Sequence, residues 1–137
     1  MELADTSAWS VRHRDRDVSA AFGGALADRQ IATCDLVKLE LLRGARDVRE
    51  LARRRAELDR LRTAAIGERA WRRALDVLEL LAEQGPLHHR RVPAPDLLVA
   101  AAAERAELPV LHYDHHFDVI AAVTGQPVRA IAPLGSL

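Results

Sequence analysis

The sequence predicts an α/β fold in which a mainly parallel central sheet lies between two layers of helices, a three-layer α/β/α sandwich. Short apolar segments alternate with longer segments whose apolar residues recur at helical spacing. This alternation indicates parallel strands joined by helical crossovers, so that helices cover both faces of the sheet. The 137 residues contain no internal repeat, low-complexity tract or long linker, and we therefore expect a single domain over residues 1–137.

Four short apolar segments are the expected strands. They comprise residues 1–4, 30–33, 109–113 and 128–132. Asp5 follows the first strand, and a polar run that begins with Asp114 follows the third. Both strands are therefore expected to end where an aspartate emerges from the sheet.

Six longer segments are expected to be helical. They comprise residues 18–26, 35–46, 46–62, 68–83, 97–107 and 117–123. Asp35 is placed to cap the second helix, and Gly85 with Pro86 to end the fourth. The apolar stripe of the third helix consists of Val48, Leu51, Leu58 and Leu61. The residues of the fourth helix that are expected to point inward are Trp71, Leu75, Leu78 and Leu81.

The composition is that of a soluble globular protein, with 49% hydrophobic and 29% charged residues. The longest strongly apolar run, residues 97–103, is too short to cross a bilayer, and the N-terminus lacks the pattern of a secretory signal. The only cysteine, Cys34, has no partner for an internal disulfide, which suits a reducing compartment. We therefore expect a cytoplasmic protein without a membrane partner.

The basic residues are almost all arginines. The formal net charge is zero, with 20 basic and 20 acidic residues, and Lys38 is the only lysine. The arginines cluster at positions 12, 14 and 16, 53–55, 72 and 73, and 90 and 91. Arginine pairs with phosphates and stacks on bases, so these clusters suit either nucleic acid or a solvated helix face.

Three acidic residues are expected at one edge of the sheet. In open α/β sheets, ligands bind beyond the carboxyl ends of the strands, which is where Asp5 and Asp114 lie. Asp96 opens a helix that should begin at the same edge. Glu40 lies within a helix among leucines, and a glutamate in such surroundings is rarely left without a partner.

Convergent carboxylates repel one another, and a divalent cation removes this penalty. Ligation by oxygen alone favours Mg²⁺ or Mn²⁺ over zinc. An ion bound in this way activates water and polarises a phosphoryl oxygen, so the pattern indicates metal-dependent phosphotransfer or hydrolysis. Structural roles remain open for each acid: Asp5 capping the turn that follows it, Asp96 as a helix N-cap, Glu40 paired with Arg43, and Asp114 as a turn residue.

Four segments resemble the sequence blocks of PIN-domain nucleases, and in particular of VapC-type toxins from toxin–antitoxin pairs. They are residues 3–9 (LADTSAW), 37–44 (VKLELLRG), 95–101 (PDLLVAA) and 110–121 (VLHYDHHFDVIA). They stand in the order and spacing of that family and together span essentially the whole chain. Each block contains one of the four acids.

The resemblance implies a PIN-like fold and an endoribonuclease that acts on structured RNA as the toxin of a type II toxin–antitoxin pair. The implied catalytic and metal-binding residues are Asp5, Glu40, Asp96 and Asp114, with Mg²⁺ as the cofactor and Mn²⁺ as its substitute. Ser7 would help to orient the acids. The resemblance further implies a homodimer and a small antitoxin that covers the active site. The expected helices at 47–62 and 68–83 offer surfaces for these contacts, or are ordinary core.

Two histidines depart from the family pattern. His116 stands where many relatives carry another acid, and His112 where many carry Thr or Ser. The His116 ring is expected to reach metal or phosphate, or to lie in solvent. Asp118 is a peripheral candidate, and the number of bound ions stays open.

Three other functions remain open. The run from His112 to His116 is dense in ligands for a transition-metal hydrolase but lacks the distant histidines of such enzymes. A phosphoaspartate enzyme would use Asp5 as the nucleophile, but Ser7 stands where it needs a second acid. The third function is a catalytically inactive PIN-like scaffold that binds RNA or protein.

Overall fold

Five short strands form the centre of the computed structural model, which describes residues 1–137. The strands are β1 (Glu2–Ala4), β2 (Ile31–Cys34), β3 (Arg62–Ala64), β4 (Val110–His112) and β5 (Val128–Ala130). They form one sheet in the order β3-β2-β1-β4-β5, and all four pairings are parallel. The expected parallel sheet is therefore confirmed.

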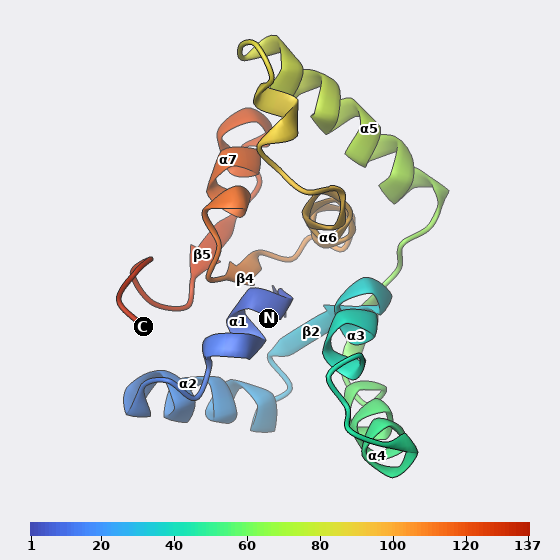
Figure 1. Ribbon diagram of the computed structural model, residues 1–137, viewed down its shortest axis with the longest axis vertical. Coiled ribbons are helices and arrows are strands. Elements are labelled where there is room, and N and C mark those ends of the chain that lie inside the picture. Colours follow the sequence, from blue (N-terminus) through green and yellow to red (C-terminus); the bar gives the residue numbers. More distant parts are fainter.

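Helices surround the sheet. They are α1 (Thr6–Val11), α2 (Arg16–Ala27), α3 (Asp35–Leu42), α4 (Val48–Leu58), α5 (Glu68–Glu83), α6 (Ala94–Arg105) and α7 (His115–Thr124), with a 3₁₀ turn η1 (His88–Arg90). From β1 the chain adds β2 and β3 on one side of the sheet, and it then crosses to add β4 and β5 on the other side. Right-handed crossovers in these two opposite directions place the helices on opposite faces. Helices α1 and α2 lie on one side of the sheet, and α5, α6 and α7 lie on the other (Figure 1). The expected α/β/α sandwich is thus confirmed.

A single cluster of 28 buried residues forms the hydrophobic core. All four residues of β2 are buried, as the central strands of a parallel sheet require. Helix α6 is buried from Leu97 to Ala103 because it packs against both α5 and α7. Leu3 and Leu111 on the adjacent strands β1 and β4 are 0% and 2% exposed, so the strands that carry Asp5 and Asp114 are anchored in the core. No helix combines the length and the apolar character that crossing a bilayer requires.

Two elements were not expected. Residues 6–11 form α1, because Asp5 accepts a hydrogen bond from the Ser7 amide and so caps a helix at the end of β1. Residues 62–64 form the edge strand β3, which overlaps the third expected helix, residues 46–62, only at Arg62. That helix is α4, which ends at Leu58, and Val48 of its apolar stripe is 79% exposed.

The expectation that Asp35 caps α3 is wrong. The N-cap residue is Cys34, without a side-chain hydrogen bond, and Asp35 is the first helical residue. The Asp35 carboxylate instead lies 3.7 Å from the Lys38 ammonium. Helix α3 also ends at Leu42, earlier than expected.

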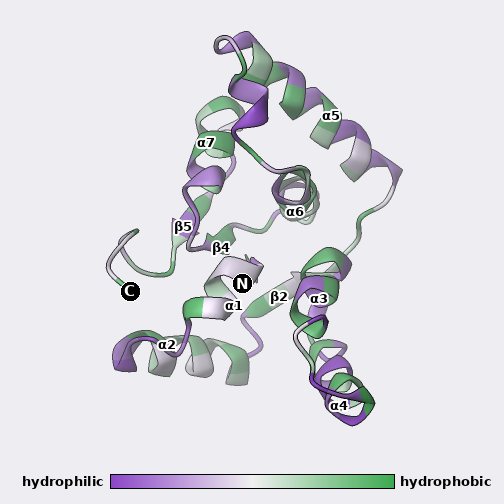
Figure 2. Cartoon of the chain, viewed as in Figure 1, coloured by the Kyte–Doolittle hydropathy of each residue, from purple (hydrophilic) through white to green (hydrophobic).

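Helix α5 has the expected bounds, and Leu81 is buried as expected, but the rest of the buried face differs. Its buried residues are Ala70, Ala74, Val77 and Leu81. Trp71 and Leu75, which were expected to point inward, are 55% and 54% exposed. The alanines allow α5 to pack closely on α6, so the larger apolar side chains lie beside that contact, and hydrophobic and hydrophilic residues both appear along α5 (Figure 2).

Candidate active site

Asp5 and Asp114 emerge side by side at the carboxyl edge of the sheet. Strands β1 and β4 are neighbours, and the Asp5 amide continues their pairing by donating to the Leu111 carbonyl at 2.9 Å. Asp5 is the N-cap of α1 and is 5% exposed. Asp114 is the N-cap of α7 and accepts a hydrogen bond from the His116 amide at 3.1 Å. Both aspartates therefore also have the local structural roles that the sequence left open.

Asp96 meets Asp114 through the ring of His116. Asp96 lies in the first turn of α6, whose N-cap is Pro93, so a capping role for Asp96 is excluded. The Nδ1 atom of His116 lies 2.9 Å from Asp96 Oδ2 and 3.0 Å from Asp114 Oδ1. A ring nitrogen between two carboxylate oxygens carries a proton, so His116 is a donor here. The ring reaches the acids and does not point freely into solvent.

Glu40 joins these residues from α3. The Thr6 hydroxyl donates to Glu40 Oε1 at 3.3 Å, which links the start of α1 to α3. Glu40 is exposed, not enclosed by leucines as expected, because Leu39 beside it is 63% exposed. Arg43 forms no ion pair with Glu40. Asp5, Glu40, Asp96 and Asp114 are called the acidic edge below.

The Ser7 hydroxyl connects the two central strands at this edge. It donates to Asp5 Oδ2 at 2.6 Å and accepts a hydrogen bond from the Tyr113 amide at 2.9 Å. The Ser7 amide also donates to Asp5 Oδ2 at 2.9 Å. Ser7 therefore fixes the Asp5 carboxylate relative to the loop that leads to Asp114.

His112 is buried beneath that loop. Its Nδ1 atom accepts a hydrogen bond from the Asp114 amide at 3.2 Å, which places the ring proton on Nε2. Burial lowers the pKa of His112, so the ring is held neutral. Its Nε2 atom lies 3.4 Å from Asp118 Oδ1, and Asp118 thus contacts His112, not the acidic edge.

The acidic edge retains negative charge that the protein does not compensate. Burial, and then the charge of Asp5, raise the pKa of Asp96 to about 6. Although the Glu40 residue as a whole is exposed, partial burial of its carboxylate, and then the charge of Asp5, raise the pKa of Glu40 as well. No arginine or lysine forms an ion pair with any of the four acids. A divalent cation would relieve this repulsion, so the donor set fits an oxygen-ligated metal.

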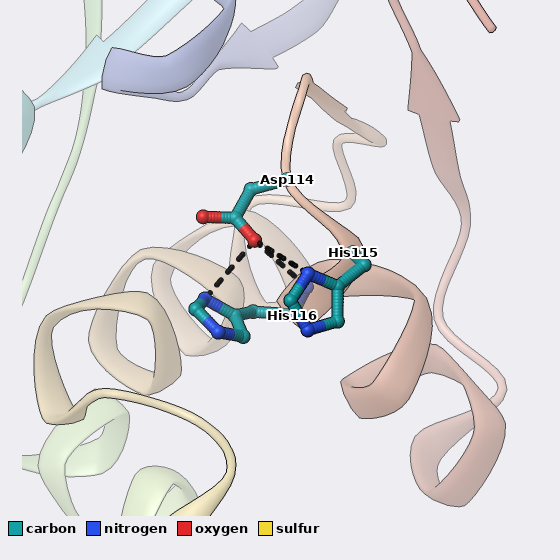
Figure 3. A group of neighbouring side chains, drawn as sticks. All are labelled: Asp114, His115 and His116. Carbon is teal, nitrogen blue, oxygen red and sulfur yellow. Dashed lines mark hydrogen bonds and ion pairs between the residues drawn. The ribbon is translucent and has the colours of Figure 1, made fainter. Parts of the chain in front are cut away.

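The spacing of the donors is uneven. Among groups of three or more potential ligands, only Asp114, His115 and His116 have ligand atoms that all lie within 4.8 Å of one another (Figure 3). No three carboxylates of the acidic edge have ligand atoms that all lie within this distance of one another. Three of them would have to move closer together to share one ion.

Two residues at the site were missing from the expected set. Thr6 holds Glu40, and its only signal in the sequence is its position directly after Asp5. The sequence indicates His115 only as part of a transition-metal hydrolase motif. Its Nδ1 atom lies 3.4 Å from Asp114 Oδ1, because His115 is the first residue of α7.

A groove of about 560 Å³ opens between α1, α2 and the α3–α4 pair. Its lining residues are Trp9, Ser10, Arg12, His13, Leu26, Leu41, Arg54, Glu57, Leu58 and Leu61. Arg12 lies 5.2 Å above the Trp9 ring, and burial followed by the charge of Arg54 lowers its pKa. The groove therefore combines an apolar floor with positive charge.

Not every arginine cluster is free for a ligand. Arg54 lies 2.7 Å from Glu50 on its own helix, and Arg73 lies 2.7 Å from Glu104 on α6. Part of the arginine content thus has a structural role.

Comparison with known proteins identifies consistent relatives. The family model described as PIN domain matches residues 3–123. Ribonuclease VapC18 from Mycobacterium tuberculosis is 41% identical over 133 residues, covering 97% of this chain and 96% of the relative. VapBC-5 from Mycobacterium tuberculosis, a member of the VapBC family of toxin-antitoxin systems, has a solved structure that matches with a TM-score of 0.58 and 29% identity, covering 94% of this chain and 95% of that chain. A toxin-antitoxin complex from Klebsiella pneumoniae shares the fold, with a TM-score of 0.70 at 17% identity over 96% of this chain and 98% of that chain.

Proposed function

The chain belongs to the PIN-domain family, in the group of the VapC ribonucleases, and we propose that it is a divalent-metal-dependent endoribonuclease that acts as the toxin of a toxin–antitoxin pair. The observation that carries this proposal is the acidic edge, where four carboxylates lie at one end of the sheet without a lysine or arginine partner. An intact acidic set favours catalysis over the alternative of an inactive RNA- or protein-binding scaffold.

We propose Asp5, Glu40, Asp96 and Asp114 as the metal-binding and catalytic residues, with Mg²⁺ or Mn²⁺ as the ion. When bound, such an ion supplies an activated water and polarises a phosphoryl oxygen. Asp5 and Asp114 would hold it from the two central strands, and Asp96 would hold it from the start of α6. Ser7 would keep the Asp5 carboxylate oriented through its 2.6 Å hydrogen bond.

The proposed substrate is RNA, bound across the acidic edge. Repulsion between phosphates and carboxylates means that RNA binding needs positive charge nearby. Arg12 and Arg43 are the C-cap residues of α1 and α3, the helices that begin near Asp5 and contain Glu40, and are suitable phosphate contacts. Cleavage of cellular RNA would place the protein in the cytoplasm, where the buried Cys34 stays reduced.

An antitoxin segment is the proposed occupant of the groove beside α1. The partly exposed apolar side chains of Leu26, Leu41 and Leu61 suit an apolar peptide face, and Arg12 suits an acidic residue within it. A segment that continued from the groove along α1 toward Asp5 would reach the acidic edge. Mixing wild type and Leu41→Ala with the cognate antitoxin would test this site by the loss of affinity.

A homodimer is proposed through the outer face of α5, where Trp71 and Leu75 are exposed next to each other on the helix. Large apolar side chains that are exposed together mark contact surfaces. A Trp71→Glu substitution should therefore shift the protein to monomers in sedimentation analysis. An unchanged dimer would place the contact elsewhere.

The test of the proposed activity uses antitoxin-free protein, total cellular RNA, and Mg²⁺, Mn²⁺ or EDTA. Asp5→Asn and Asp96→Asn are compared with Asp28→Asn, which removes an exposed aspartate whose carboxylate has no hydrogen-bond partner. Sequencing of fragment ends should show discrete cuts that need the metal. Each active-site substitution should slow cutting by about 10²-fold or more, and Asp28→Asn should not.

Two outcomes would overturn the proposal. Cleavage that survives Asp5→Asn would place the chemistry elsewhere. Retention of RNA without cleavage by wild type would favour the inactive scaffold.

A further inference from the structure

Two histidine rings converge on one oxygen of Asp114. The Oδ1 atom of Asp114 lies 3.4 Å from His115 Nδ1 and 3.0 Å from His116 Nδ1, and the three ligand atoms lie within 4.8 Å of one another (Figure 3). Ligands that share an ion at bond lengths of about 2.0–2.2 Å are about 3.0–3.5 Å apart in octahedral or tetrahedral sites. Both distances to Asp114 fall within this range without rearrangement.

This spacing follows from the start of α7. Asp114 caps the helix, and His115 and His116 are its first two residues, so three ligands project from one rigid turn. Asp96 Oδ2, 2.9 Å from His116 Nδ1, supplies a further oxygen from α6. The His115 side chain is 67% exposed, which leaves the remaining coordination positions open to water.

The donor atoms differ in chemical type from those of the acidic edge. Imidazole nitrogen is a preferred ligand for zinc, cobalt and nickel, whereas Mg²⁺ keeps oxygen ligands and several waters. His115 and His116 therefore place two nitrogen ligands beside the carboxylate oxygens of Asp114 and Asp96.

We propose that Asp114, His115 and His116 form a transition-metal site that binds Zn²⁺ or Co²⁺ more tightly than Mg²⁺. This site goes beyond the proposed nuclease function and shares Asp114, with the neighbouring Asp96, with the acidic edge. A metal ion there takes the place of the proton that His116 Nδ1 now shares with the two carboxylates. The edge of the sheet then offers two kinds of cation position, one all-oxygen and one of mixed nitrogen and oxygen.

The experiment is titration of the metal-free full chain with Co²⁺, followed by its visible absorption, with calorimetric titration of Zn²⁺ and Mg²⁺ alongside. The variants are His115→Ala and His116→Asp. The control is His13→Ala, which removes an exposed histidine of a different surface that pairs only with Ser19. Circular dichroism of every variant establishes that the fold is retained.

Wild type and His13→Ala should bind one Co²⁺ with the absorption of a nitrogen-ligated ion. His115→Ala and His116→Asp should each weaken Co²⁺ and Zn²⁺ binding by about tenfold or more, since loss of an outer-shell partner alone costs about 10- to 100-fold. His116→Asp should at the same time strengthen Mg²⁺ binding, because it adds an oxygen ligand. Unchanged Co²⁺ binding in both histidine variants would overturn the proposal.

Asp5→Asn separates this proposal from that of the nuclease. It removes a residue of the acidic edge but none of the three ligands, so the Co²⁺ absorption should persist while RNA cleavage is lost. Loss of the Co²⁺ absorption in Asp5→Asn, with both histidine variants unaffected, would assign the bound ion to the carboxylates alone. A nuclease that fails in every metal would leave the Co²⁺ result for the histidine site intact.

Discussion

The carboxylates of the acidic edge and the carboxylate of Glu50 at the start of α4 have opposite electrostatic surroundings. Glu50 on α4 accepts hydrogen bonds from the Arg46 amide at 2.9 Å and the Arg46 Nε at 3.0 Å, and it lies 2.7 Å from Arg54. These contacts, led by the Arg46 amide, lower the pKa of Glu50. Asp96 has only the His116 ring as a partner, and its pKa is raised to about 6.

The absence of basic partners at the acidic edge does not reflect a shortage of basic residues in the chain. The chain has 20 basic residues, and Glu50 alone engages two of them, whereas none pairs with the acidic edge. The charge of Glu50 is thus satisfied within the protein. The cation that we propose at the edge would neutralise the charge that the protein leaves without a partner there.

The largest effect expected from this comparison is stabilisation by metal. An ion that binds only the folded state, at about 100 times its Kd, contributes about 2.7 kcal/mol and raises Tm by about 10 °C in a chain of this size. Calorimetry in Mn²⁺ and in EDTA measures the shift. It should be retained in Glu50→Gln and reduced in Asp96→Asn; equal shifts in the two variants would mean that the ion binds away from the edge.

Ser7→Ala tests whether the Ser7 hydroxyl holds the Asp5 carboxylate in position, since no basic residue pairs with it. The substitution removes the hydrogen bond to Asp5 and leaves the Tyr113 amide without its acceptor, which should cost about 1–3 kcal/mol in urea unfolding. Ser10→Ala is the matched control, since it loses only one exposed hydrogen bond to the Thr6 carbonyl. Equal stability of the two variants would show that the Ser7 bridge does not support the edge.

Neutralising one carboxylate in each region should change stability with opposite signs. In EDTA near neutral pH, Asp96→Asn should stabilise the protein by about 1 kcal/mol, after allowance for solvent screening of the raised pKa. Glu50→Gln should destabilise it, because Arg46 and Arg54 lose their ionic partner. Urea unfolding of both variants measures the signs, and a loss of stability in Asp96→Asn would contradict an uncompensated edge.

The pH dependence of these differences is the smallest effect. The folded pKa of Asp96, about 6, lies above its ordinary value of 3.8. The stability contributed by the protonated Asp96 carboxyl group is therefore fully present below pH 3.8 and is lost as the pH rises through 6. The advantage of Asp96→Asn should therefore appear only as pH rises through that window. The folded pKa of Glu50 is lowered below 4.5, so its contribution is present above 4.5 and lost as pH falls. Unfolding curves over this pH range should show the two trends running in opposite directions.

The parallel sheet and the meeting of Asp5 with Asp114 could be predicted from the sequence, because apolar strands followed by aspartates fix both the direction and the edge. The start of α5 and its end before Gly85 were equally predictable. Its buried face was not, since the choice between the alanine stripe and the Trp71 stripe depends on how closely α6 approaches.

The side-chain contacts at the site could not be predicted from the spacing of residues in the sequence. The exposure of Glu40 depends on where α3 sits against α1, a tertiary contact made through Thr6. The bridge from His116 to Asp96 joins residues on two helices, α6 and α7, and appears in the sequence only as a departure from the family pattern. The short edge strand β3 has no apolar alternation of its own and is defined by its pairing with β2.

The two tryptophans give the molecule a separate optical reporter for each of its proposed protein contacts. Trp9 packs edge-on against Phe22 at 5.0 Å in the groove beside α1, and Trp71 is exposed on α5. With Trp71→Phe, fluorescence would follow only the groove, and with Trp9→Phe only the outer face of α5. Antitoxin binding and self-association are then each readable from the emission of one single-tryptophan variant, without an attached dye.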